Sequence, residues 1–102
     1  MGLTHQQIDE RSILLHRAVA QKIRQNHDRL ATARANLHRR AAQGGARTYW
    51  EEWEALLDGP LVDLLAFMVS PSEEACRLRQ RSPFAGILPP RERWKIYESF
   101  AA

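Results

Sequence analysis

Apolar residues recur along this chain at steps of three and four positions, the spacing of one face of an α-helix. Near the amino terminus, Ile8, Leu15, Val19 and Ile23 follow such a spacing. Alternation of apolar and polar residues, which is typical of a half-buried β-strand, occurs in no segment of the sequence. The pattern therefore predicts an all-α fold in which each helix buries one face against the others.

Residues that start and stop helices divide the chain into short segments. The spacing of a capping box, in which two residues satisfy the first amides of a helix, occurs at Thr4–Gln7, Thr48–Glu51 and Ser70–Glu73. Gly44-Gly45 and Gly59-Pro60 are pairs of residues that end helices. These signals predict a compact bundle of five to six short helices.

We expect a single helical domain over residues 1–102, since a chain of this length has the size of one small domain. The first helix is expected over about residues 4–25, with an extension past its end left open. Asn26 or Asp28 would cap the second helix, and a last helix is expected from about Pro90.

A proline-rich segment precedes the last predicted helix. Residues 82–90 contain three prolines and Gly86, so they can form neither a regular helix nor a central strand. The same segment carries the large apolar side chains of Phe84, Ile87 and Leu88. We therefore expect a packed loop whose apolar side chains reach the core.

The charges are segregated along the chain, although the formal net charge is only +3. Every lysine and arginine lies in residues 1–47 or 77–102, whereas the charged side chains of residues 48–76 are all acidic. Such segregation can steer a charged partner toward the protein. The interpretation that we favour is that the acidic middle packs beside the basic ends within one fold.

The histidines are evenly spaced at His5, His16, His27 and His38, eleven residues apart. On one helix, successive members would lie ~16 Å apart, too far to bind one metal ion within a chain. A row of histidines at a contact between chains is the functional interpretation. We prefer solvated or helix-end positions, because the capping signals interrupt the helix near Asn26.

The candidate nucleophiles are Cys76, Ser82 and Ser99, and none of them has a histidine nearby in the sequence. Cys76 is the single cysteine, which excludes a disulfide within the chain. The sequence contains no phosphate-binding loop, zinc-protease motif or dinucleotide-binding turn. We therefore expect no enzymatic activity, no catalytic residues, no cofactor and no metal site.

Nucleic-acid binding is the alternative function. Arginines that could lie along phosphates gather in and just before the second predicted helix, at Arg24, Arg29, Arg34, Arg39 and Arg40. The junction at residues 26–28 is short enough for a helix-turn-helix, but the predicted flanking helices are longer than those of that motif. A small DNA-binding transcriptional regulator therefore ranks below a protein-binding role.

The segment from Arg77 to Phe100 combines arginine with aromatic residues, the types that contribute most at protein interfaces. It joins a basic helix end, the proline-rich loop and a last helix in which charged and aromatic residues alternate. Part of the segment can also close the core. The candidate partner-binding residues are Arg77, Arg79, Arg81, Phe84, Arg91, Arg93, Trp94 and Tyr97.

This tail, RLRQ-SPFAG-ERW, together with the opening Arg11-Ser12-x-x-Leu15-His16, resembles small helical bacterial antitoxins of type II toxin–antitoxin pairs. The resemblance covers Glu10 to Phe100, with His27 in the place of the proline that usually precedes the second helix of that group. It implies a protein that neutralises a cognate toxin enzyme by direct contact, docking a helix against the toxin's active-site cleft. It assigns no residue to that contact.

A cytoplasmic location is expected, because the first helix is not preceded by a signal peptide and no apolar run approaches the roughly 20 residues of a membrane-spanning helix. No contact with a membrane is expected. A homodimer formed through the first helix, with a role in assembly, is a third hypothesis.

Overall fold

Six α-helices and one 3-10 turn make up the fold in the computed structural model, which describes residues 2–44 and 47–100. No β-strand occurs within these residues, and the all-α prediction is confirmed. The elements are α1 (His5–Gln25), η1 (His27–Arg29), α2 (Leu30–Ala42), α3 (Arg47–Asp58), α4 (Leu61–Met68), α5 (Glu73–Arg79) and α6 (Pro90–Ser99).

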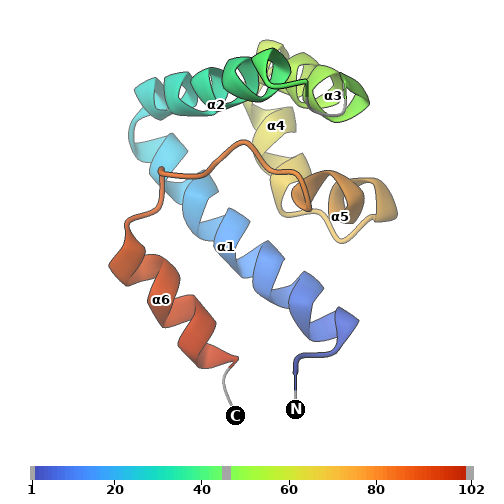
Figure 1. Cartoon of the computed structure of the whole chain (residues 1–102). Coiled ribbons are helices and arrows are strands. Elements are labelled where there is room, and N and C mark those ends of the chain that lie inside the picture. Colours follow the sequence, from blue (N-terminus) through green and yellow to red (C-terminus); the bar gives the residue numbers. More distant parts are fainter. Residues whose placement is uncertain (1, 45–46, 101–102) are drawn as a thin grey trace.

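Helix α1 is the longest element, and the other helices are arranged around it (Figure 1). Helices α2 and α3 pack side by side, and α4 contacts α1, α3 and α5. Helix α6 runs antiparallel beside α1: Glu92 near its start pairs with Lys22 (3.0 Å), and Tyr97 near its end lies under the guanidinium group of Arg11. The predicted bundle of short helices is confirmed.

Trp53 lies at the centre of the core and is fully buried. Its indole Nε1 donates a hydrogen bond to the carbonyl oxygen of Leu78 (3.0 Å), so the polar end of a large apolar side chain is satisfied. Its ring meets the ring of Phe84 edge-on, with the centroids 5.3 Å apart. Ile23 of α1 and Met68 of α4 are also fully buried. The centre of the core therefore joins α1, α3 and α4.

Residues 80–89, which we call the connector, pass across α1 between α5 and α6 (Figure 1). Phe84, Ile87 and Leu88 are buried, so the predicted packed loop is confirmed. The buried Asn36 of α2 donates from Nδ2 to the carbonyl oxygens of Pro83 (2.8 Å) and of Ala85 (2.9 Å). The connector is thus held by its apolar side chains and by bonds to its backbone.

Several predicted helix signals act as expected. The Thr4–Gln7 capping box is formed, with the Thr4 hydroxyl accepting from the Gln7 amide (3.1 Å) and the Gln7 side chain accepting from the Thr4 amide (2.9 Å). Asn26 ends α1 but caps the 3-10 turn; α2 has Arg29 at its N-cap with no side-chain bond, so the prediction that Asn26 or Asp28 caps the second helix is wrong. Gly44 follows α2 with φ of 77°, the left-handed conformation that glycine adopts most easily. Gly45 lies outside the described residues.

Two other predicted caps are wrong. Thr48 does not precede the third helix, because α3 already begins at Arg47. Ser70 does not cap α5, because its hydroxyl accepts from the amide of Ser72 (3.2 Å), which precedes the helix, while its carbonyl oxygen accepts from the buried Arg79 (2.6 Å). Ser72 caps the helix instead, accepting from the amide of Ala75 (3.2 Å).

Ion pairs join the acidic middle of the chain to its basic ends, as predicted. Arg34 of α2 pairs with Asp58 of α3 (2.6 Å), and Arg77 of α5 pairs with Glu52 of α3 (3.1 Å). The charge segregation therefore has a role within the fold. Within the described ranges, no helix has the length and apolar character needed to cross a bilayer.

We predict that Asn36→Ala lowers the free energy of unfolding by about 2–4 kcal/mol, since two carbonyl groups of the connector lose their donor. Unfolding in urea, followed by circular dichroism, measures the change. Asn26→Ala is the matched control and should cost about 1 kcal/mol, because it removes only an exposed cap. Equal losses in the two variants would contradict the role given to Asn36.

Candidate functional site

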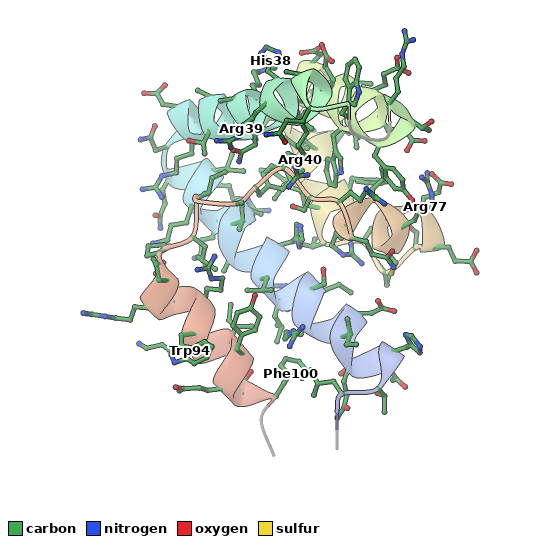
Figure 2. The ribbon with its side chains drawn as sticks, in the orientation of Figure 1. His38, Arg39, Arg40, Arg77, Trp94 and Phe100 are labelled. Carbon is green, nitrogen blue, oxygen red and sulfur yellow. The ribbon has the colours of Figure 1, made fainter. Side chains whose placement is uncertain are left out.

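The eight predicted partner-binding residues do not form one surface. Arg77, Arg79, Arg81 and Phe84 belong to α5 and the connector, whereas the other four belong to α6. Figure 2 shows Arg77 and Trp94 in well-separated parts of the molecule. The two groups are therefore described separately.

Arg79 and Phe84 are buried, with 5% and 4% of their surfaces exposed, which corrects their prediction as partner-binding residues. The Arg79 guanidinium donates to the carbonyl oxygens of Met68 (3.2 Å) and Ser70 (2.6 Å), so it closes the turn between α4 and α5. Residues two apart on a helix point in different directions, and Arg79 follows the inward face that includes Leu78. Neither residue can meet a partner without opening the core.

Arg77 is engaged by carboxylates of its own chain. Its Nη2 lies 3.1 Å from an oxygen of Glu52 and 3.1 Å from an oxygen of Glu74. The hydrogen bonds that Arg77 donates to Glu52, and then to Glu74, raise the pKa of Arg77 above its usual value. A partner would have to compete with both carboxylates, so Arg77 is a poor candidate for recognising an acidic group.

The other group forms an exposed surface on α6, which we call the α6 surface: Pro90, Arg91, Arg93, Trp94 and Tyr97. Trp94 is 63% exposed, and its ring meets that of Tyr97 edge-on at 6.0 Å. These residues line a shallow hollow of about 440 Å³. Arg91 and Arg93 are exposed and make no ion pair among the described residues.

The exposure of Trp94 follows from how α6 packs. Helix α6 has no buried residue, and its main contact among the described helices is with α1. Ile96 faces the core cluster, so Trp94, two positions earlier, points away from it. Phe100 is half-buried. Tyr97 is half-buried as well, so Trp94 is the most exposed of these three aromatic side chains.

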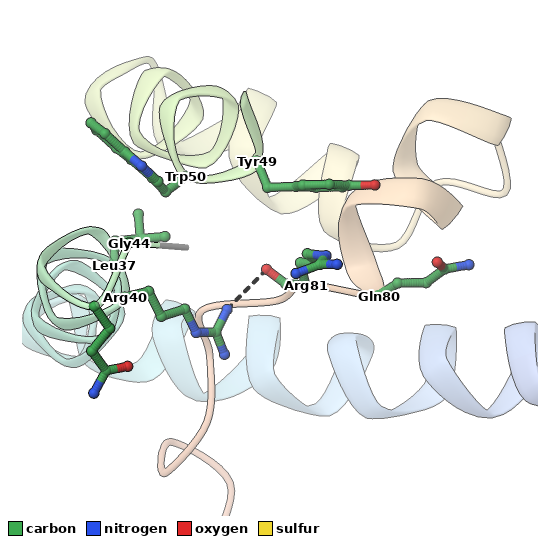
Figure 3. Close-up of a pocket in the computed structure, with 8 residues that line it drawn as sticks. Leu37, Arg40, Gly44, Tyr49, Trp50, Gln80 and Arg81 are labelled. Carbon is green, nitrogen blue, oxygen red and sulfur yellow. Dashed lines mark hydrogen bonds between the residues drawn. The ribbon is translucent and has the colours of Figure 1, made fainter. Parts of the chain in front are cut away.

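A second hollow, not predicted from the sequence, lies between α2, α3 and the end of α5 (Figure 3). Its volume is about 580 Å³, and we call it the arginine pocket. Arg40 reaches into it from α2 and donates from Nη1 to the carbonyl oxygen of Arg81 (3.1 Å). The residues that line it are Leu37, Arg40, Gln43, Gly44, Tyr49, Trp50, Gln80 and Arg81.

The sequence signal for this pocket is weak because its two arginines lie 41 positions apart. Arg81 was predicted to bind a partner together with its sequence neighbours, and Arg40 to contact nucleic acid. Only the packing of α2 against α3 and the path of the connector bring the two together. No local pattern of residues could have paired them.

The arginines predicted to contact phosphates are largely engaged inside the fold. Arg34 donates to Asp58 and to the carbonyl oxygen of Leu57 (2.9 Å). Arg39 donates to the side-chain oxygen of Asn36, and Arg40 holds the connector. These bonds tie the guanidinium groups of Arg34 and Arg39 to groups of their own chain, whereas Arg40 keeps further N–H donors besides the one it gives to the connector.

His16 is buried, with 7% of its surface exposed, which corrects the preferred interpretation of all four histidines as solvated or helix-end residues. His5, His27 and His38 are exposed, and α1 ends before His27, so no continuous row of histidines forms. Among the described residues, no group of three potential ligands could hold a metal ion.

The structure brings Ser82 to His16, although 66 positions separate them. Nδ1 of His16 lies 2.7 Å from the carbonyl oxygen of Ser12, and Nε2 lies 2.9 Å from Oγ of Ser82. Because a carbonyl oxygen can only accept, Nδ1 carries the proton and Nε2 accepts from the serine hydroxyl. Burial lowers the pKa of His16 to about 4, against the opposing bond to Ser12.

A serine that donates to a histidine has the arrangement of an activated nucleophile. However, a histidine with a pKa of about 4 is a weak base at neutral pH. The Ser82 oxygen also accepts from the amide of Phe84 (3.3 Å), which fixes it in the turn of the connector. We interpret the pair as a structural link between α1 and the connector.

We predict that stability falls as the pH drops from about 6.5 toward 4, because His16 binds a proton in the unfolded chain before it does in the folded one. The free energy of unfolding should fall by about 3 kcal/mol over this range. The stability that comes from the neutral His16 is fully present above pH 6.5. The measurement is urea unfolding at several pH values. His16→Asn removes the titrating group, so its difference in stability from the original protein should shrink as the pH falls.

His38→Asn is the matched control, since His38 is exposed. It makes the same change of residue type at a position outside the core. A constant difference for His16→Asn over the same range of pH would contradict the assignment of a buried, neutral histidine.

Comparison of the chain with protein families, with curated proteins and with solved structures finds no match. The candidate sites are therefore defined by geometry alone. They are the α6 surface, which was largely predicted, and the arginine pocket, which was not.

Proposed function

We propose that this chain is an antitoxin-like inhibitory protein of the bacterial cytoplasm that neutralises a partner toxin enzyme by direct contact through the α6 surface. The observation that carries the proposal is the exposure of Trp94, 63% of whose surface is open to solvent beside two arginines. Tryptophan, tyrosine and arginine are the residues in which binding energy concentrates at protein interfaces. An exposed tryptophan in such a setting favours a binding role.

The chemistry of the surface favours a partner with an acidic groove. Arg91 and Arg93 extend from the same helix as Trp94, and no carboxylate among the described residues pairs with them. Helix α6 lies at the edge of the bundle and packs mainly on α1, so a groove could receive its outer face without disturbing the core. In such a contact Trp94 would fill the groove and the arginines would set its orientation.

The resemblance of the tail to antitoxins supports the proposal only in part. Of its three blocks, the first two include the buried Arg79 and Phe84 and lie in α5 and the connector. The third block, Glu92-Arg93-Trp94, lies on α6 and includes two residues of the α6 surface. The first two blocks therefore serve the fold, and the third is the one available to a partner.

The test is co-expression with the product of the adjacent reading frame in a bacterial host. We predict that the neighbour alone arrests growth and that co-expression of this chain restores it. Trp94→Ala combined with Arg93→Glu should abolish the rescue, because the variant loses the aromatic anchor and reverses one charge. Growth and co-purification are the two readouts.

Val62→Ala combined with Arg17→Glu is the matched control, since both side chains are exposed and lie on other helices. This variant should rescue as well as the original protein. Circular dichroism checks that both variants fold. Rescue that survives loss of Trp94 and Arg93, or a neighbour that is harmless and does not co-purify, would overturn the proposal.

The two other hypotheses are less well supported but stay testable. A DNA-binding regulator would bind random duplex DNA with a steep dependence on salt, although Arg34 and Arg39 of α2 already donate to groups of their own chain. A homodimer through α1 would use its exposed apolar residues Ile8 and Leu14. A mass measurement in solution that finds only monomer would exclude the homodimer.

A further inference from the structure

The arginine pocket holds two positive charges that no described carboxylate neutralises. Arg40 and Arg81 take part in no ion pair among residues 2–44 and 47–100, and no acidic residue lines the pocket. Their neighbour Arg77 shows the contrast, because it contacts two carboxylates. The pocket is thus a place where an anion would meet uncompensated charge.

Both guanidinium groups are held in position. Arg81 lies over the ring of Tyr49, 4.9 Å from its centroid, and this contact restricts the side chain of an otherwise exposed residue. Arg40 donates one hydrogen bond to the carbonyl oxygen of Arg81, and its remaining N–H groups stay available for a ligand. Guanidinium groups fixed in this way are suited to two-point contacts with a phosphate.

The rest of the lining is apolar or uncharged. Leu37 of α2 and the half-buried Trp50 of α3 supply apolar walls, while Gln43 and Gln80 add carboxamides that can both donate and accept hydrogen bonds. At about 580 Å³, the pocket has the size of sites for small organic ligands. A single carboxylate side chain of a partner protein would leave most of this volume, and the apolar walls, unused.

We propose that the arginine pocket binds a nucleoside monophosphate group, either free or at the end of a single strand, with the phosphate on Arg40 and Arg81 and the base toward Trp50 and Leu37. The site lies apart from the α6 surface and does not depend on the proposed inhibitory function. It gives the chain a second binding activity.

Isothermal titration of the full chain tests the proposal with four probes: adenosine monophosphate, adenosine, inorganic phosphate and a hexathymidylate with a 5′-phosphate. Adenosine monophosphate should bind, and adenosine and inorganic phosphate should bind more weakly by about tenfold or more, since each lacks half of the contacts. Tighter binding of the hexathymidylate would identify the strand end as the source; tighter binding of adenosine monophosphate would identify the free nucleotide.

Arg81→Gln should weaken the binding of adenosine monophosphate by about tenfold or more, because one charge-assisted contact is lost. The main-chain carbonyl that accepts from Arg40 is retained, so the fold should be preserved. Arg40→Lys keeps the charge but not the forked geometry, and it should also weaken binding. Arg17→Gln on α1 is the matched control, since Arg17 is exposed and lines neither candidate site, and this variant should bind normally.

Equal binding of adenosine monophosphate and inorganic phosphate would reduce the pocket to a general anion site and overturn the proposal. Unchanged affinity in Arg81→Gln would overturn it as well. Failure of the growth rescue would leave this result untouched, because the variants that test the α6 surface keep both pocket arginines.

Discussion

The backbone of the connector has to find hydrogen-bond partners inside the fold, because residues 80–89 form no helix that could supply them. Side chains from two helices, α1 and α2, hold the segment in place. Asn36 donates to two carbonyl groups, Arg40 donates to a third, and His16 binds the hydroxyl of Ser82. Much of the polar chemistry in this protein serves this one segment, and the position of both candidate sites follows from it. The arginine pocket lies where the connector begins, and the α6 surface lies where it ends.

The fold was predictable because its information is local. Helical spacing, glycine stops and the capping box at Thr4 act within a few residues, and the helices formed where these signals placed them. The errors at Thr48 and Ser70 have a different origin. The Ser70 hydroxyl accepts from the amide of Ser72, and its carbonyl oxygen accepts from Arg79, nine positions later. Helix ends shift by one or two residues against local signals, because tertiary context readily overrides a weak local preference.

The candidate sites were predictable only where they occupy one helix. Arg91, Arg93, Trp94 and Tyr97 lie within two turns of α6, so the sequence shows them together. Arg79 and Phe84 are also an arginine and an aromatic residue, but both are buried. Residue type alone does not show whether a side chain faces the solvent or the core. His16 and Ser82, or Arg40 and Arg81, meet only after the chain has folded. Pairs so far apart in the sequence leave no periodic signal.

The bonds between α1 or α2 and the connector also set the order in which the molecule can be completed. Helices α1 and α2 are synthesised before the connector, so their inner faces stay uncovered until that later segment is made. His16 and Ser82 are separated by most of the chain, and contacts of such long range form slowly. A nascent chain that stops before the connector leaves the ribosome with an open bundle. The bundle is therefore closed by a segment that is made after the helices it covers.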